Sequence, residues 1–95
     1  MSEVTLTGHF IVPESDLQAI LRELPNHIEA SRNEPGCIKF EATQDEALPN
    51  KFHLSERFAS PEAFEQHKQR AAGTEWAKAA ANVERHFDIR GLDTD

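Results

Sequence analysis

Apolar residues recur at two different intervals along the chain, and these intervals divide it into strands and helices. A two-residue interval, typical of a strand with one buried face, occupies residues 4–12, 37–43 and 51–58 and returns in residues 86–90. The polar stretch 45–50 has a length that suits a hairpin loop between the second and third of these segments. The pattern therefore predicts four strands.

Intervals of three and four residues predict a first helix after the first strand. Its apolar face spans residues 17–28, and Ser15–Gln18 before it fits a capping box. Pro25 lies inside this segment, lacks a backbone N–H and predicts a kink or a break near Leu24. Residues 33–36, Asn-Glu-Pro-Gly, predict the end of the helix and a turn.

Two further helices are predicted between the third and fourth strands. Ser60 followed by Pro61 is a strong helix start, because serine caps the free N–H groups and proline suits the first turn. Gly73 and Thr74 interrupt this helix, and the apolar positions of residues 76–83 predict a short third helix with Thr74 as its cap.

The resulting order is β-α-β-β-α-(α)-β, which is simplest to pack as a four-stranded antiparallel sheet with the helices on one side, an α+β, ferredoxin-like fold. We expect one domain over residues 1–90 and a tail over residues 91–95. The alternation predicts a helix-facing apolar side made of Val4, Leu6, Phe10, Ile38, Phe40, Phe52, Leu54, Phe58, Phe87 and Ile89.

The opposite side of the predicted sheet is rich in threonine, serine and histidine. It comprises Thr5, Thr7, His9, Ile11, Cys37, Thr43, His53, Ser55, Arg57 and His86. This side either meets a second copy of the chain or is a plain solvated surface, and the pattern leaves both interpretations open. A chain of 95 residues buries a modest share of its surface, so dimerisation is an available source of stability.

Charge and composition exclude several classes of partner. Ten basic against seventeen acidic residues give a net charge of −7, which argues against binding to nucleic acid or to anionic lipid. No apolar run approaches the roughly 20 residues of a membrane-spanning helix, and no secretory signal is visible at Met1. The single cysteine, Cys37, forms no internal disulfide, so a cytoplasmic location is expected.

Two polar residues at predicted buried positions are candidates for catalysis. His67 lies on the apolar face of the second helix, where a neutral imidazole can accept a proton. Glu56 occupies an apolar-side position of the third strand and needs a partner there, with His67 and Arg32 as the choices. A packing role for His67 and a structural ion pair for Glu56 remain the alternatives.

Aromatic residues on the same predicted side are candidates for binding a flat substrate. These are Phe40, Phe64 and Trp76, with Leu54 beside them, although ordinary core packing explains them equally well. The histidines have no short metal-ligand spacing, and no phosphate-binding loop is present. The sequence therefore predicts neither a metal nor an organic cofactor.

Three motifs in register give the chain a family resemblance. They are Arg32–Glu41 (RNEPGCIKFE), Ser55–Phe58 (SERF) and Phe64–His67 (FEQH). Their order and spacing over about residues 4–90 resemble the antibiotic biosynthesis monooxygenase (ABM) family, which includes quinol monooxygenases. The resemblance implies a dimeric α/β barrel, built from two ferredoxin-like sheets packed face to face, with a pocket between sheet and helices in each subunit.

The resemblance also implies an activity. Enzymes of this family oxidise phenolic or quinol-like aromatics with O2 and use neither metal nor flavin, so His67 and Glu56 become the expected proton-handling group and its orienter. Other members bind haem or have no known activity. Haem-degrading relatives place their iron-ligating histidine where this chain has Trp76-Ala77-Lys78, which argues against haem degradation. A non-enzymatic dimer that binds a small aromatic ligand, or acts as an accessory subunit, is the alternative.

Overall fold

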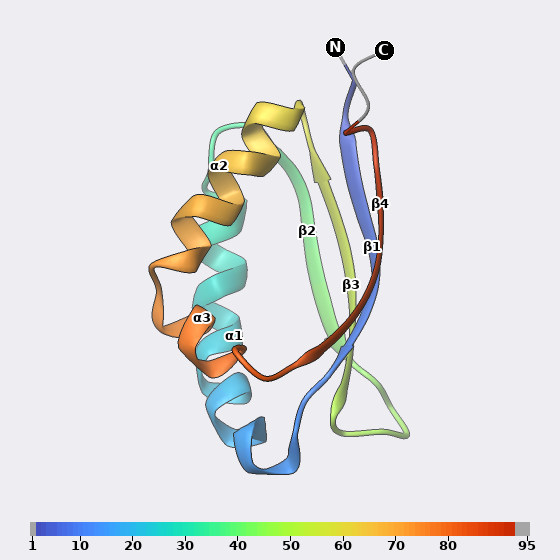
Figure 1. Ribbon diagram of the computed structural model, residues 1–95, viewed down its shortest axis with the longest axis vertical. Helices are drawn as coiled ribbons and strands as arrows, with labels where there is room; N and C mark the ends of the chain where they lie inside the picture. The colour runs from blue at the N-terminus through green and yellow to red at the C-terminus, as the bar shows by residue number, and fades with distance from the viewer. Residues whose placement is uncertain (1, 93–95) are drawn as a thin grey trace.

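The computed structural model describes residues 2–92 and contains one four-stranded antiparallel sheet with the helices on one face (Figure 1). The strand order is β2-β3-β1-β4, which confirms the expected ferredoxin-like fold. The elements are β1 (Val4–Ile11), a 3-10 turn (Glu14–Asp16), α1 (Leu17–Arg32), β2 (Cys37–Gln44), β3 (Lys51–Phe58), α2 (Pro61–Ala72), α3 (Glu75–Ala79) and β4 (Glu84–Arg90). Part of the predicted tail, residues 93–95, lies outside the described residues.

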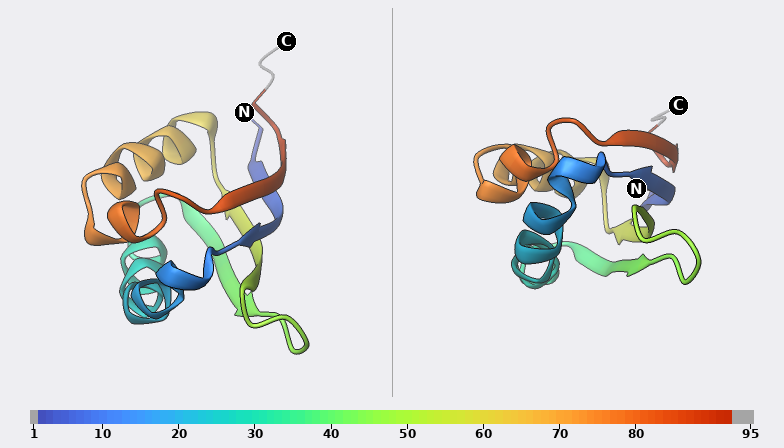
Figure 2. Two further views of the ribbon diagram at one scale, coloured as in Figure 1. Left: turned by 60° about the horizontal axis from the view of Figure 1, so that its bottom comes forward. Right: turned by 90° about the horizontal axis from the view of Figure 1, so that it is seen from below.

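The helices form a single layer against the sheet, as the two views of Figure 2 show. None of the helices in residues 2–92 combines the length and the apolar character that crossing a bilayer requires.

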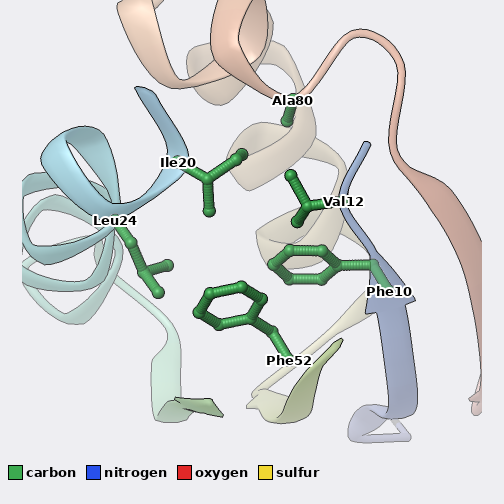
Figure 3. Close-up of a cluster of buried hydrophobic side chains, with 6 residues drawn as sticks. All are labelled: Phe10, Val12, Ile20, Leu24, Phe52 and Ala80. Carbon is green, nitrogen blue, oxygen red and sulfur yellow. The ribbon is translucent and has the colours of Figure 1, made fainter. Parts of the chain in front are cut away.

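The core lies between these two layers and is divided into two clusters. One joins β1, β3, α1 and the end of α3 through Phe10, Val12, Ile20, Leu24, Phe52 and Ala80, whose side chains point toward one another (Figure 3). The other comprises Val4, Leu6, Phe40, Phe58 and Phe64. Most of the predicted apolar side of the sheet is therefore buried beneath the helices, as the two-residue alternation requires.

Ile38 is an exception, and its placement on the apolar side was wrong. It is 51% exposed. The pairing of β2 with β3 changes register between Cys37 and Lys39, which is a bulge, so the alternation before the bulge no longer matches that of Phe40. A bulge of this kind cannot be recognised from the alternation of apolar and polar residues.

The expectation at Pro25 was a kink or a break, and the break is wrong because the first helix is continuous through this residue. Pro25 is exposed, whereas Leu24 and His27 on the other side of the helix are buried against the sheet and α3. Burial of that face outweighs the missing backbone hydrogen bond. The predicted capping box is also absent, because Ser15 lies in the 3-10 turn and Asp16, at the N-cap, makes no side-chain cap.

The second helix starts as predicted, because the Ser60 side chain accepts a hydrogen bond from the Ala63 backbone N–H at 3.1 Å. The third helix is shorter than expected and ends at Ala79. The chain after it enters β4 at Glu84, two residues earlier than the alternation indicated.

Gly36 lets the turn before β2 pass directly beside α2. Its φ is +87°, and a Cβ there would lie 2.7 Å from the Ala63 Cβ. We expect Gly36→Ala to lower the free energy of unfolding by about 1–3 kcal/mol, measured by urea denaturation, because it adds backbone strain and a steric overlap. Gly73→Ala is the control, since the nearest atom to its Cβ is 3.9 Å away. Equal stability of the two variants would contradict the expectation.

Candidate functional site

A cavity of about 480 Å³ lies between the sheet and the helices. Its size falls in the range that accepts a small organic ligand. The structure places all six residues singled out in the sequence around it: Phe40, Leu54, Glu56, Phe64, His67 and Trp76. They come from β2, β3, α2 and α3, and the wall is predominantly apolar.

His67 is buried on α2 and is held through one ring nitrogen. Its Nδ1 lies 2.9 Å from Oε1 of Glu34, a residue of the turn between α1 and β2. A carboxylate is an acceptor only, so Nδ1 carries the proton and donates a hydrogen bond to Glu34. The other nitrogen, Nε2, is then the free acceptor of the neutral ring. Burial lowers the pKa of His67 below its ordinary value, although the Glu34 charge opposes this shift.

Glu34 is itself held in place by a second charge. Arg70, one turn further along α2 than His67, forms an ion pair with Glu34 through its Nε. The Arg70 guanidinium also donates to the Ser31 hydroxyl at 3.3 Å, and that hydroxyl donates to the His27 carbonyl at 2.6 Å. The turn, α1 and α2 are therefore joined by one polar network that fixes the His67 ring.

Glu56 faces the free nitrogen of His67 across the cavity wall. It is 6% exposed, and its Oε1 lies 4.0 Å from the His67 Nε2. Burial, with a further contribution from the negative charge of Glu34, raises the pKa of Glu56 to about 8. Because burial raises the pKa of Glu56 and lowers that of His67, both side chains are neutral at pH 7. The Glu56 carboxyl group is then the acid of the pair, and the His67 imidazole is the base. Arg32 is not its partner, because it donates to the Phe40 carbonyl at 3.0 Å.

The protonation of Glu56 predicts an unusual dependence of stability on pH. Its folded-state pKa of about 8 lies above the ordinary value of 4.5, so the folded state binds this proton more tightly and loses stability as pH rises between these values. The loss amounts to about 5 kcal/mol at most.

We therefore expect Glu56→Gln to become more stable relative to the unmodified protein as pH is raised from 5 to 8, measured by urea denaturation at each pH. Glu41→Gln, at an exposed position of β2, is the control and should show no such trend. If the free energy of unfolding of Glu56→Gln and of the unmodified protein changes in parallel from pH 5 to 8, Glu56 is ionised in the folded protein over this range.

Two residues of this site were missed in the sequence. Glu34 was assigned to a turn alone, although it stands in the motif that carries the family resemblance. His27 was overlooked as one polar residue of α1, yet it continues the buried face of Ile20, Leu24 and Ser31 at spacings of four, three and four. His27 lines the cavity and stacks on Trp76, with ring centroids 4.6 Å apart and planes at 8°.

The polar side of the sheet lies away from this cavity. His9 pairs with His53 on β3 and with His86 on β4, so the three histidines form a row across the exposed face. His53 bonds Asp45 at 2.7 Å, and His9 stacks on His86 at 4.8 Å. Among residues 2–92, no group of three or more histidine, cysteine, aspartate or glutamate side chains is arranged to hold a metal ion.

The sequence model described as antibiotic biosynthesis monooxygenase (ABM) matches residues 4–86, most of the chain. The chain belongs to the antibiotic biosynthesis monooxygenase family. The three motifs of the ABM resemblance lie within the matched residues. A search of curated proteins finds no significant match.

Solved structures support the ABM fold. A "putative antibiotic biosynthesis monooxygenase" from Nitrosomonas europaea is 24% identical, with a TM-score of 0.74, and the match covers 94% of this chain and 96% of that one. MupZ from Pseudomonas fluorescens has a TM-score of 0.75 at 19% identity, covering 96% of this chain and 73% of that one. A second "putative antibiotic biosynthesis monooxygenase", from Deinococcus radiodurans, has a TM-score of 0.69 at 16% identity, covering 98% and 94%. At these identities the likeness is one of fold.

Proposed function

We propose that this ABM protein is a monooxygenase that oxidises a small phenolic or quinol-like aromatic with O2 and needs neither metal nor flavin. The observation that carries the proposal is the placement of buried His67 and Glu56, 4.0 Å apart, in the wall of an apolar, aromatic-lined cavity. Such a pair suits a substrate that must lose a proton inside a predominantly apolar site. His67 and Glu56 are the proposed catalytic residues, and Phe40, Leu54, Phe64 and Trp76 the proposed binding residues.

The substrate hydroxyl gives its proton to the His67 Nε2, which is the free acceptor because Nδ1 is protonated and hydrogen-bonded to Glu34. The phenolate that forms is stabilised by a hydrogen bond from the protonated Glu56 carboxyl group. A carboxylic acid kept neutral in an apolar site is an effective donor to a developing oxyanion. In this mechanism Glu34 orients His67, whereas Glu56 meets the substrate.

The overall reaction balances without another reductant. A phenol that keeps one ring C–H supplies four electrons when its O–H and that C–H both become C=O, giving a quinone. O2 accepts these four electrons, one oxygen atom enters the ring and the other leaves as water. The substrate anion therefore serves as the source of electrons for O2, and the protein supplies the base, the hydrogen-bond donor and the shape of the site.

We further propose, from the ABM resemblance, that the protein is a cytoplasmic homodimer that closes a barrel through the polar side of the sheet. The proposal is supported by the exposed row of His9, His53 and His86, which lies on the face opposite the helices. Sedimentation equilibrium should give twice the 10.7 kDa mass of the chain. A monomer at micromolar concentration would contradict this assembly.

Oxygen uptake tests the proposed activity. The protein, freed of metal by a chelator, is mixed with a panel of phenols and quinols, and the rate of uncatalysed oxidation is subtracted. With ¹⁸O2 as oxidant, we expect a quinone that contains one labelled atom and a second labelled atom in water. Ligand binding without oxygen uptake would refute the activity and favour a binding or accessory module.

A further inference from the structure

Arg85 is a basic residue on the side of the sheet that mostly presents apolar side chains to the helices. It lies on β4 directly opposite the buried Phe10 of β1, and paired residues of neighbouring strands point to the same side of a sheet. Phe87 and Ile89 follow on that side at the two-residue spacing of a strand. All four residues line the cavity, and Arg85 is exposed, so it forms a part of the wall that solvent reaches.

The guanidinium of Arg85 is largely unoccupied. Its Nη2 donates one hydrogen bond, to the Ala80 carbonyl just after α3, at 3.2 Å. A guanidinium has five N–H donors, so most of them remain available to a ligand. Carboxylates of the chain pair instead with other arginines, namely Arg22, Arg57, Arg70 and Arg90. Arg85 therefore places a positive charge beside the cavity that no acidic side chain within residues 2–92 neutralises.

The charges around the cavity are opposite in sign to the charge of the chain. The chain carries a net charge of −7, yet Glu56 is the one acidic residue among the described side chains that line the cavity. Burial raises the pKa of Glu56 to about 8, so it adds little negative charge at neutral pH. Arg85 and Lys68 contribute two positive charges to the same lining. Lys68 already pairs with Glu65 at 3.1 Å, which leaves Arg85 as the cation available to a ligand.

We infer that Arg85 binds a carboxylate of the substrate, and that the substrate is a hydroxylated aromatic acid. A planar guanidinium can hold a carboxylate through two parallel hydrogen bonds, and such charge-assisted bonds are stronger than those between neutral groups. The hydroxyl then lies at the buried His67 and Glu56, and the carboxylate lies at the wall that solvent reaches, where it keeps part of its hydration. This role rests on the proposed function and narrows its substrate class.

Anaerobic binding of hydroxynaphthoates tests the role of Arg85 without turnover. Each hydroxynaphthoate, in a panel that varies the position of the carboxylate, is compared with its carboxamide, which has a similar planar shape without the charge. The unmodified protein should bind at least one carboxylate about tenfold more tightly than its carboxamide, and high salt should reduce this ratio. Arg85→Gln removes the charge, so it should bring the ratio to about one and leave the affinity for the carboxamide within about threefold.

Further variants separate binding by Arg85 from a general effect of charge or of folding. Arg22→Gln removes an exposed arginine of α1 that does not line the cavity, so it should leave the ratio unchanged. Arg85→Lys keeps the charge and a donor for the Ala80 carbonyl but loses the fork of the guanidinium, so it should recover part of the preference. Thermal melts check that each variant is folded. If Arg85→Gln does not fold, the same ratio measured in Arg85→Met decides the question.

Three results would overturn the role of Arg85 and leave the proposed function intact. They are a carboxylate preference that persists in folded Arg85→Gln, an equal loss of that preference in Arg22→Gln, and a protein that oxidises phenols but binds no hydroxynaphthoate more tightly than its carboxamide. A protein that shows the carboxylate preference but consumes no O2 would refute the oxygenase activity and leave Arg85 as a binding residue. A protein that binds neither class and consumes no O2 would refute both proposals.

Discussion

Replacing His67 with alanine should slow the oxidation of an active phenol by 10²–10⁴-fold, the usual contribution of general base catalysis. The Nε2 of His67 is the free acceptor in the cavity, and Glu56, the nearest alternative, is already protonated at neutral pH. Among the described side chains that line the cavity, His27 is the one other neutral imidazole. Its pKa of about 3 makes it a much weaker base than His67. The measurement is kcat/KM for oxygen uptake, corrected for uncatalysed oxidation.

Two further proteins make this result interpretable. Gln66→Ala changes the neighbouring, exposed residue of α2 and should leave the rate unchanged. His67→Asn retains a polar side chain in the buried position but has no basic nitrogen. It should therefore be as slow as His67→Ala, which would show that the slow rate comes from loss of the base and not from lower stability of the alanine variant. A rate within about twofold of the unmodified protein in a folded His67 variant would remove His67 from the mechanism.

Replacing Glu34 with glutamine should lower kcat by about 10–100-fold, although Glu34 touches no substrate. Its carboxylate accepts a hydrogen bond from the Nδ1–H of His67 and pairs with Arg70, so it selects the tautomer that leaves Nε2 free. A glutamine amide can also donate to Nδ1, which would place the proton on Nε2. The Glu34 charge also raises the pKa of His67, so its removal should move the acidic limb of the kcat/KM profile to lower pH.

The His67 tautomer and the pH profile of kcat/KM distinguish a positioning role of Glu34 from a general loss of stability. The tautomer of His67 can be read from its ¹⁵N NMR shifts, which a general loss of stability would not invert. Glu29→Gln, at an exposed position of α1, removes the same charge elsewhere and should change neither the rate nor the pH profile. If Glu34→Gln keeps the Nδ1–H tautomer and the original acidic limb, Glu34 has no positioning role.

The fold was largely predictable because both repeating intervals were clear. Strand alternation placed Phe10, Phe52 and Phe58 in the core, and each is buried. The failures were local events in which packing or hydrogen bonding departs from the regular pattern. The bulge at Cys37/Lys39 turned Ile38 outward, and burial of α1 against the sheet and α3 kept the helix continuous through Pro25.

The candidate site was predictable only as a set of residue types on one side of the sheet. Glu56 and His67 stood out because polar groups at apolar positions are costly to bury without partners. The residues that contact them, Glu34 and His27, did not stand out. Helical and strand periodicity describe a residue's own element and contain no information on which distant segment packs against it.

The sequence alone determined the order of strands and helices, the burial of one side of the sheet, and the family to which the chain belongs. Only the tertiary structure decided that Glu34, 33 residues before His67, accepts a hydrogen bond from its Nδ1–H. It also decided that burial raises the pKa of Glu56 to about 8, and that the Nδ1 of His27 has no hydrogen bond within residues 2–92. The reason is physical. Burial and contacts between distant segments set the protonation state and the hydrogen bonds of a side chain, and both arise only when the helices close over the sheet.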